Sequence, residues 1–137
     1  MQDATRSLVE ISLEWAAKKL GAADGFSLVG MSEDADAVRR GIVVHVKSDA
    51  DMQVSAREFL DNTHATRFAL VGEGTIAAGG TTISVLIVYW QDGSQAQVQL
   101  GLMPYTRGEQ GEVQLADRMV ASDHAPPGSW LPAPKEA

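Results

Sequence analysis

The residues at 72–77 have the clearest resemblance to a chemical motif. They read Gly-Glu-Gly-Thr-Ile-Ala after an apolar stretch, which matches the dinucleotide-binding pattern G-x-G-x-x-G/A. In such a site a helix must begin directly after the glycines, because its N-terminal amides hold the pyrophosphate. Here residues 78–82 contain two more glycines and two threonines, and another apolar run follows. We therefore expect a strand interrupted by glycine, with a bulge or a close backbone contact, and no cofactor.

Acidic residues occur as two Asp-x-Asp pairs. Asp34 and Asp36 are followed by Val38 and two arginines, so the alternating oxygen ligands of a calcium loop do not continue. Asp49 and Asp51 precede an amphipathic stretch, where acidic residues cap a helix. Neither pair predicts a metal site.

The three histidines, His45, His64 and His124, lie far apart and do not have the spacing of a local zinc site. His45 lies in a β-branched run, where a catalytic role would require a carboxylate or nucleophile from elsewhere in the fold. No G-x-S-x-G sequence is present, so a hydrolase is not indicated.

A ligand pocket would have to be built from residues that are distant in the sequence. Glu73 shares a strand face with Arg67, and a buried Glu73 near a charged partner would be a site because such surroundings perturb carboxylate acidity. An exposed ion pair on a wet sheet face is the alternative. The pocket candidates are His45, Arg67, Glu73, Tyr89, Trp90 and Tyr105.

Two helices are expected to position these residues. Residues 3–20 place Leu8 and Trp15 on one apolar stripe with helical spacing, and Gly21 is a suitable terminator. A second helix is expected over residues 51–62. Strands are expected at residues 26–31, 41–47, 67–77, 82–91 and 95–105, with a polar loop at 32–40, turns at 78–80 and 91–93, and a further strand or short helix at 112–120.

The strand at 82–91 is apolar on both faces. Ile83, Val85, Ile87 and Tyr89 share one face, and Leu86, Val88 and Trp90 share the other. Both faces must therefore be covered, by helices on one side and by a second subunit or the chain's own tail on the other. The interface candidates are Leu86, Val88, Trp90, Trp130 and Leu131.

The prolines of residues 122–137 exclude regular structure there, so we divide the chain into one domain at 1–121 and a proline-rich tail. Trp130 and Leu131 lie between prolines and would lose little entropy on docking. The tail contains no P-x-x-P, which argues against an SH3 ligand.

The composition is that of a globular protein. The 137 residues fit one domain, cysteine is absent, and the formal net charge of −7 is spread along the chain. An acidic surface repels phosphate, so nucleic-acid binding is not expected. The N-terminus lacks the features of a signal peptide and no apolar run is long enough to span a bilayer, which predicts a cytoplasmic location and no membrane partner.

We therefore predict an α+β fold, a single antiparallel meander of five to six strands with two helices packed on one face. The element order resembles that of roadblock and longin domains and, in part, that of cone-shaped nuclear-transport-factor-2 folds. That resemblance concerns element order alone and transfers no residue. Because no complete catalytic constellation is present, we expect a non-catalytic, homodimeric protein-binding module. The alternatives are a small-molecule-binding or catalytic domain with a pocket between sheet and helices, and an acidic chaperone-like partner of another protein.

Overall fold

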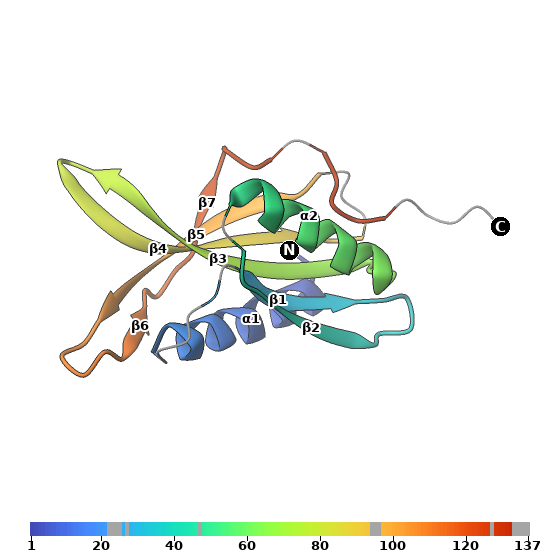
Figure 1. Ribbon diagram of the computed structural model, residues 1–137, viewed down its shortest axis with the longest axis horizontal. Coiled ribbons are helices and arrows are strands. Elements are labelled where there is room, and N and C mark those ends of the chain that lie inside the picture. The colour runs from blue at the N-terminus through green and yellow to red at the C-terminus, as the bar shows by residue number, and fades with distance from the viewer. Residues whose placement is uncertain (22–25, 27, 47, 94–96, 127, 133–137) are drawn as a thin grey trace.

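The computed structural model describes residues 1–137 except 22–25, 27, 47, 94–96, 127 and 133–137. Within the described residues the chain forms two helices and seven strands (Figure 1). Their order is α1 (Asp3–Gly21), β1 (Leu28–Glu33), β2 (Arg39–Val44), α2 (Asp49–Asn62), β3 (Arg67–Ala78), β4 (Thr81–Gln91), β5 (Gln99–Arg107), β6 (Val113–Leu115) and β7 (Val120–Ser122). The predicted α+β class is confirmed.

The strands form one open antiparallel sheet in the order β2-β1-β3-β4-β5-β6, and β7 also pairs with β5. The long β3–β4 hairpin turns at Gly79 and Gly80, whose φ values of 58° and 81° are those of a two-residue turn that suits glycine. Several predicted strand limits shift by a few residues, and His45 lies just beyond the end of β2. The segment at 112–120, for which the sequence predicts either a strand or a short helix, contributes β6 and the first residue of β7.

Helix α1 packs on one face of the sheet. Its buried side chains include Leu8, Leu13 and Leu20, as the helical spacing predicts. They meet a row of side chains from β1, β3, β4 and β5, namely Val29, Ala69, Val71, Leu86, Val88, Trp90, Met103 and Tyr105. This cluster is the larger part of the core.

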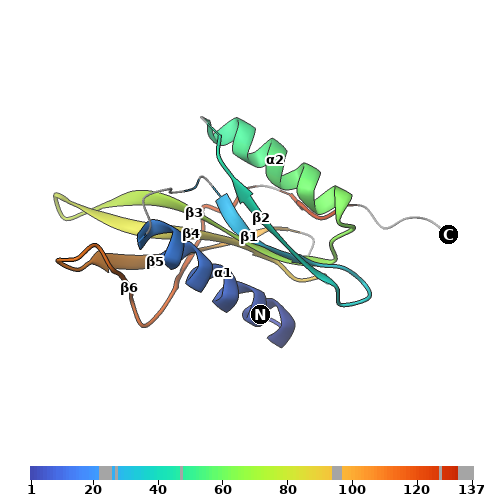
Figure 2. The same ribbon diagram turned by 60° about the horizontal axis from the view of Figure 1, so that its bottom comes forward.

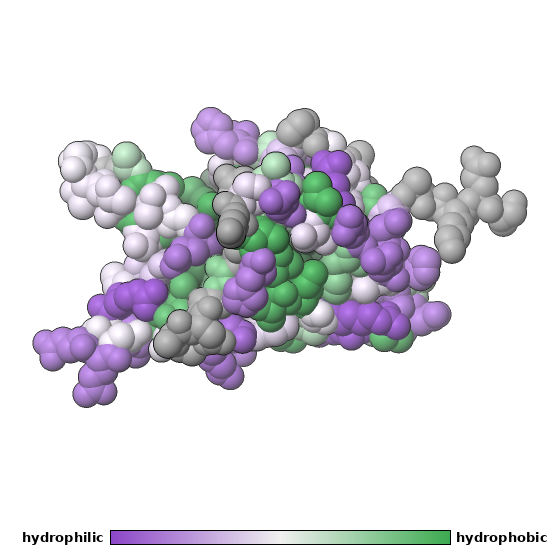
Figure 3. Space-filling model, viewed as in Figure 1, coloured by the Kyte–Doolittle hydropathy of each residue, from purple (hydrophilic) through white to green (hydrophobic). Residues whose placement is uncertain are grey.

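Helix α2 lies on the opposite face, which corrects the expectation that both helices share one face (Figure 2). Ala56 and Leu60 of α2 pack with Leu28, Phe68 and Leu70. The central strands are therefore apolar on both sides, and each face needs its own cover. In Figure 3 the apolar surface gathers in the middle of the view, between α1 and α2.

The C-terminal tail covers a further part of the α2 face, over Phe68 and Tyr89. Trp130 is 3% exposed and stacks on Phe68 and Tyr89, with ring centroids 6.0 and 4.9 Å apart. Gln91 fixes the tail further. Its side-chain Oε1 accepts the backbone N–H of Trp130 at 3.1 Å, and its Nε2 donates to Ser129 Oγ at 2.7 Å. The tail thus packs on its own chain.

Neither described helix combines the length and apolar character needed to cross a membrane.

Candidate functional site

Two of the predicted pocket residues meet in a hydrogen bond. Tyr105 Oη on β5 donates to Glu73 Oε2 on β3 at 2.5 Å. Glu73 is exposed, whereas Tyr105 is 7% exposed. Burial, and then the adjacent Glu73 carboxylate, raises the pKa of the Tyr105 hydroxyl above its ordinary value. The pair therefore keeps the phenol protonated and directs its proton at the carboxylate.

A cavity of about 370 Å³ adjoins this pair. It is lined by Glu73, Gly74, Thr75, Ser84, Tyr105 and Arg107. The residues that line the cavity come from β3, β4 and β5, near the place where the β3–β4 and β5–β6 hairpins diverge. The two hairpins extend to the left in Figure 1. Arg107 holds β5 against the end of α1, because its Nη1 donates to the Leu20 carbonyl at 2.9 Å.

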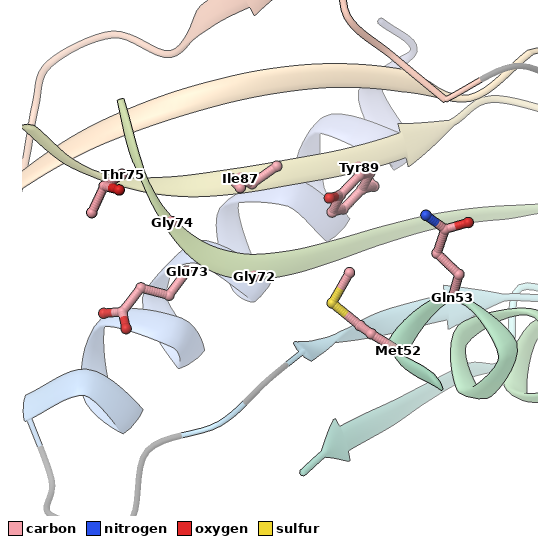
Figure 4. Close-up of a pocket in the computed structure, with 8 residues that line it drawn as sticks. All are labelled: Met52, Gln53, Gly72, Glu73, Gly74, Thr75, Ile87 and Tyr89. Carbon is pink, nitrogen blue, oxygen red and sulfur yellow. The ribbon is translucent and has the colours of Figure 1, made fainter. Parts of the chain in front are cut away.

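A second cavity, of about 270 Å³, lies on the other face of the same β3 segment, between the sheet and the first turn of α2. Gly72 and Gly74 leave its floor without side chains, and Met52, Gln53 and Tyr89 contribute to its walls (Figure 4). In Figure 4 the Glu73 side chain points away from Met52, to the other side of β3. The 72–77 segment lies entirely within β3, which pairs with β4 in unbroken register, so the bulge expected at the glycines is absent from this pairing.

Arg67 is not the partner of Glu73. Its Nη1 lies 3.1 Å from Glu33 Oε1, and Glu33 Oε2 accepts from Arg39 Nε at 2.9 Å. The register explains this, since Glu33 on the middle strand β1 stands directly opposite Arg39 on β2 and Arg67 on β3. The buried Glu33 side chain thus connects the three strands β2, β1 and β3. The sequence does not single it out, because residues 32–40 are expected to form a loop.

The remaining pocket candidates lie elsewhere. Trp90 is 9% exposed and belongs to the core beneath α1, and His45 is exposed. Neither lines the two cavities. Of the interface candidates, Leu86 and Val88 are fully buried under α1, Trp130 is buried by its own chain, and Leu131 is half-buried.

One surface extends the apolar strand face of Ile83 and Ile87, for which the sequence predicts a cover, to residues of three further strands. Directly paired residues project from the same face of an antiparallel sheet, so the register places these side chains together. We call this surface the open sheet face, and it consists of Ile76, Ile83, Ile87, Leu102, Pro104 and Val120. All are half-buried except Val120, which is 58% exposed. The surface lies on the α2 side, beyond α2 and Trp130.

The acidic pairs have local roles. Asp34 Oδ1 accepts from the backbone N–H groups of Val38 and Asp36, and Arg40 pairs with Asp34 Oδ2. The Val38 bond, with the others, lowers the pKa of Asp34. Ser48, and not Asp49 or Asp51, is the N-cap of α2, because its side chain accepts the Asp51 N–H; this corrects the expectation that the acidic pair caps the helix. Within the described residues, no group of three or more His, Asp or Glu side chains is arranged to hold a metal ion.

Comparisons with protein-family models, with curated proteins and with solved structures give no significant match.

Proposed function

We propose that this protein is a non-catalytic protein-binding module that associates with a second copy of itself through the open sheet face. The observation that carries the proposal is the uncharged, apolar character of that face. It crosses β3, β4, β5 and β7, and Val120 at its margin is 58% exposed. Contiguous exposed apolar surface is typical of interaction sites.

The state of Tyr105 argues against its acting as a catalytic base. A tyrosine acting as a base near neutral pH needs a lowered pKa, whereas the pKa of Tyr105 is raised. The exposed His45 does not lie at either cavity beside Glu73. The Tyr105–Glu73 pair is therefore suited to hydrogen bonding and not to proton abstraction by the tyrosine.

The open sheet face is the surface at which a second copy meets the least charge repulsion. Each chain carries a formal net charge of −7, so most surfaces of two copies repel each other. Among the described strand residues on the α2 side from β3 to β7, none is charged. Contact through this face buries apolar atoms and brings no like charges into direct opposition.

Sedimentation velocity on the full chain tests the proposal. We expect a concentration-dependent shift from monomer to dimer between about 1 and 100 µM. Val120→Lys should move the equilibrium towards monomer by placing a charge on the contact. Val54→Lys is a matched control, because Val54 is similarly exposed, at 55%, but lies on α2. A wild-type monomer throughout this range would overturn the dimer proposal, as would equal effects of the two variants.

The glycine-floored cavity supports a second candidate, a small-molecule-binding domain. It contains Tyr89 and lies between the sheet and α2, where a ligand pocket was predicted. A Cβ at position 74 would lie 2.6 Å from Ile87 Cδ1, so Gly74→Ala should push the Ile87 side chain into the cavity. Indole, as a probe, should raise the Tm of the wild type and not that of Gly74→Ala. The absence of any wild-type shift would exclude this candidate for small aromatic ligands.

A further inference from the structure

A polar cavity lies on the α1 side of the sheet, away from the open sheet face. Its volume is about 370 Å³, and it is lined by Glu73, Gly74, Thr75, Ser84, Tyr105 and Arg107. Thr75 and Ser84 are directly paired, so their side chains share one face with Glu73, two residues earlier. The hydrogen bond from Tyr105 to Glu73 places β5 side chains on the same face. We call this space the polar cavity.

Two opposite charges line the polar cavity without pairing with each other. Glu73 Oε2 accepts from Tyr105 Oη at 2.5 Å, and Ser84 hydrogen-bonds to the same phenol oxygen. Arg107 Nη1 donates to the Leu20 carbonyl, at the end of α1, at 2.9 Å. Among the ion pairs of the described residues, none joins Glu73 to Arg107. Each charged group is thus oriented by a bond to its own chain and not by the opposite charge.

The remaining polar atoms define what a ligand must offer. In the described part of the chain, Glu73 Oε1 and Arg107 Nη2 have no hydrogen-bond partner, and neither has the Thr75 hydroxyl. An ionised carboxylate only accepts hydrogen bonds, and a guanidinium only donates them. A ligand that contacts both must therefore present a donor to Glu73 and an acceptor to Arg107.

The two charges also restrict the charge of the ligand. An anion attracted by Arg107 is repelled by Glu73, and a cation attracted by Glu73 is repelled by Arg107. Both side chains belong to exposed residues, so either contact alone contributes little. A molecule that carries both charges makes the two contacts together, and the second contact is then intramolecular. Because such a molecule has no net charge, the acidic chain as a whole does not repel it.

We propose that the polar cavity binds a small zwitterion, with its ammonium group on Glu73 and its carboxylate on Arg107. The volume of about 370 Å³ is within the range of small-molecule sites. Both contacts are hydrogen bonds between oppositely charged groups, which are stronger than neutral ones. Free amino acids are the chemical class that carries these two groups. The inference goes beyond the proposed dimer, because the dimer uses the opposite face of the sheet.

Titration of the full chain, followed through its amide chemical shifts, tests the proposal. Glycine and 4-aminobutyrate are the probes, because they carry the two charges at a short and at a longer spacing. Glycinamide and 4-aminobutyramide lack the negative charge, and the N-acetylated acids lack the positive one. At least one of the two zwitterions should give saturable shifts of the Gly74, Ser84 and Arg107 amides. It should bind at least about tenfold more tightly than both of its singly charged derivatives.

Two results of this titration would overturn the proposal. One is that neither zwitterion binds more tightly than its own derivatives, since binding would then not require both charges. The other is the absence of saturable shifts at these three amides, since any binding would then take place elsewhere on the chain.

Variants that remove one charge test the protein side. Glu73→Gln and Arg107→Gln should each weaken binding of the zwitterion at least about fivefold, because each leaves a single ionic contact. Glu58→Gln and Arg57→Gln are matched controls, since both residues are exposed and lie on α2. The controls should change the affinity less than about twofold. Equal losses in variants and controls would contradict the proposal, and if a variant fails to fold, the matched probes on the wild type decide.

The variant Val120→Lys separates this site from the proposed dimer contact. Val120 belongs to the open sheet face, so its substitution should leave the affinity for the zwitterion within about twofold of the wild type. Loss of zwitterion binding in this variant would overturn the assignment of the site to a single chain. Failure of the wild type to dimerise would leave the titration result unaffected.

Discussion

At the scale of single residues, the informative pair is Glu73 and Tyr105. A buried phenol donates to an exposed carboxylate at 2.5 Å, and the pKa of the phenol rises in consequence of burial and the neighbouring charge. The phenol is therefore protonated throughout the neutral range. Its hydroxyl connects β5 to β3 across β4, close to the point where β4 and β5 cease to pair.

The raised pKa of Tyr105 predicts a loss of stability in alkali. The unfolded tyrosine ionises at its ordinary pKa of 10.0, whereas the folded one resists ionisation. The contribution of Tyr105 to the free energy of unfolding is thus fully present below pH 10.0 and declines as pH rises towards the folded pKa. Urea unfolding below and above this pH should show a smaller alkaline loss for Tyr105→Phe than for the wild type.

Glu73→Gln separates the two causes of this shift. It keeps an acceptor but removes the charge, so the pKa of Tyr105 should fall part of the way towards its ordinary value, with the effect of burial remaining. Tyrosinate absorbance during an alkaline titration measures it. An unchanged pKa in Glu73→Gln would show that Glu73 does not act on Tyr105.

At the scale of elements, the proline-rich tail covers part of the sheet, on the same face as α2. Helix α2 covers β1, β2 and part of β3, and the tail brings Trp130 onto Phe68 and Tyr89. The Trp130 Nε1 atom is buried and has no hydrogen-bond partner among the described residues. The contribution of this side chain is therefore packing of its rings.

Trp130→Ala should lower the free energy of unfolding by about 3 kcal/mol, because it leaves a cavity over Phe68. Trp130→Phe should cost less, since it keeps an aromatic ring and removes the unpaired donor. Urea unfolding monitored by far-UV circular dichroism measures both. A loss below about 1 kcal/mol for the alanine variant would show that the tail is not part of the cooperative core.

At the scale of the whole molecule, charge and apolar surface are segregated. The chain carries a net charge of −7, yet the described strand residues of the α2 side from β3 to β7 are uncharged. In a dimer formed through this side, two chains of net negative charge meet at a contact that itself contains no charged strand residue. Long-range repulsion should then be the main electrostatic term in the dimerisation.

Sodium chloride should therefore strengthen the proposed dimer, because it screens the repulsion between two acidic chains. Sedimentation at low and high salt should show a lower dissociation constant at high salt. A dimer that weakens with salt would instead depend on ion pairs and would rule out the open sheet face as the contact.

The sequence by itself determined the two helices and the long β3–β4 hairpin. Helical spacing of Leu8 and Trp15 defined α1, and period-two alternation with glycine turns defined β3 and β4, because such patterns depend on neighbours along the chain. The doubly apolar strand at 82–91 also showed that both sheet faces need cover. Glu73, Tyr89 and Tyr105 could be named from residue type alone.

Only the tertiary structure decided which residues meet. Arg67 contacts Glu33 and not Glu73, and the helices cover opposite faces, since strand register and helix side depend on how distant segments dock. The point at which β4 and β5 cease to pair was also decided by the tertiary structure, because the periodicity of one strand does not specify how far its partner runs beside it. The tertiary structure also decided the role of Trp130. This side chain is buried on Phe68 and Tyr89 of its own chain and is therefore not exposed to a neighbouring molecule.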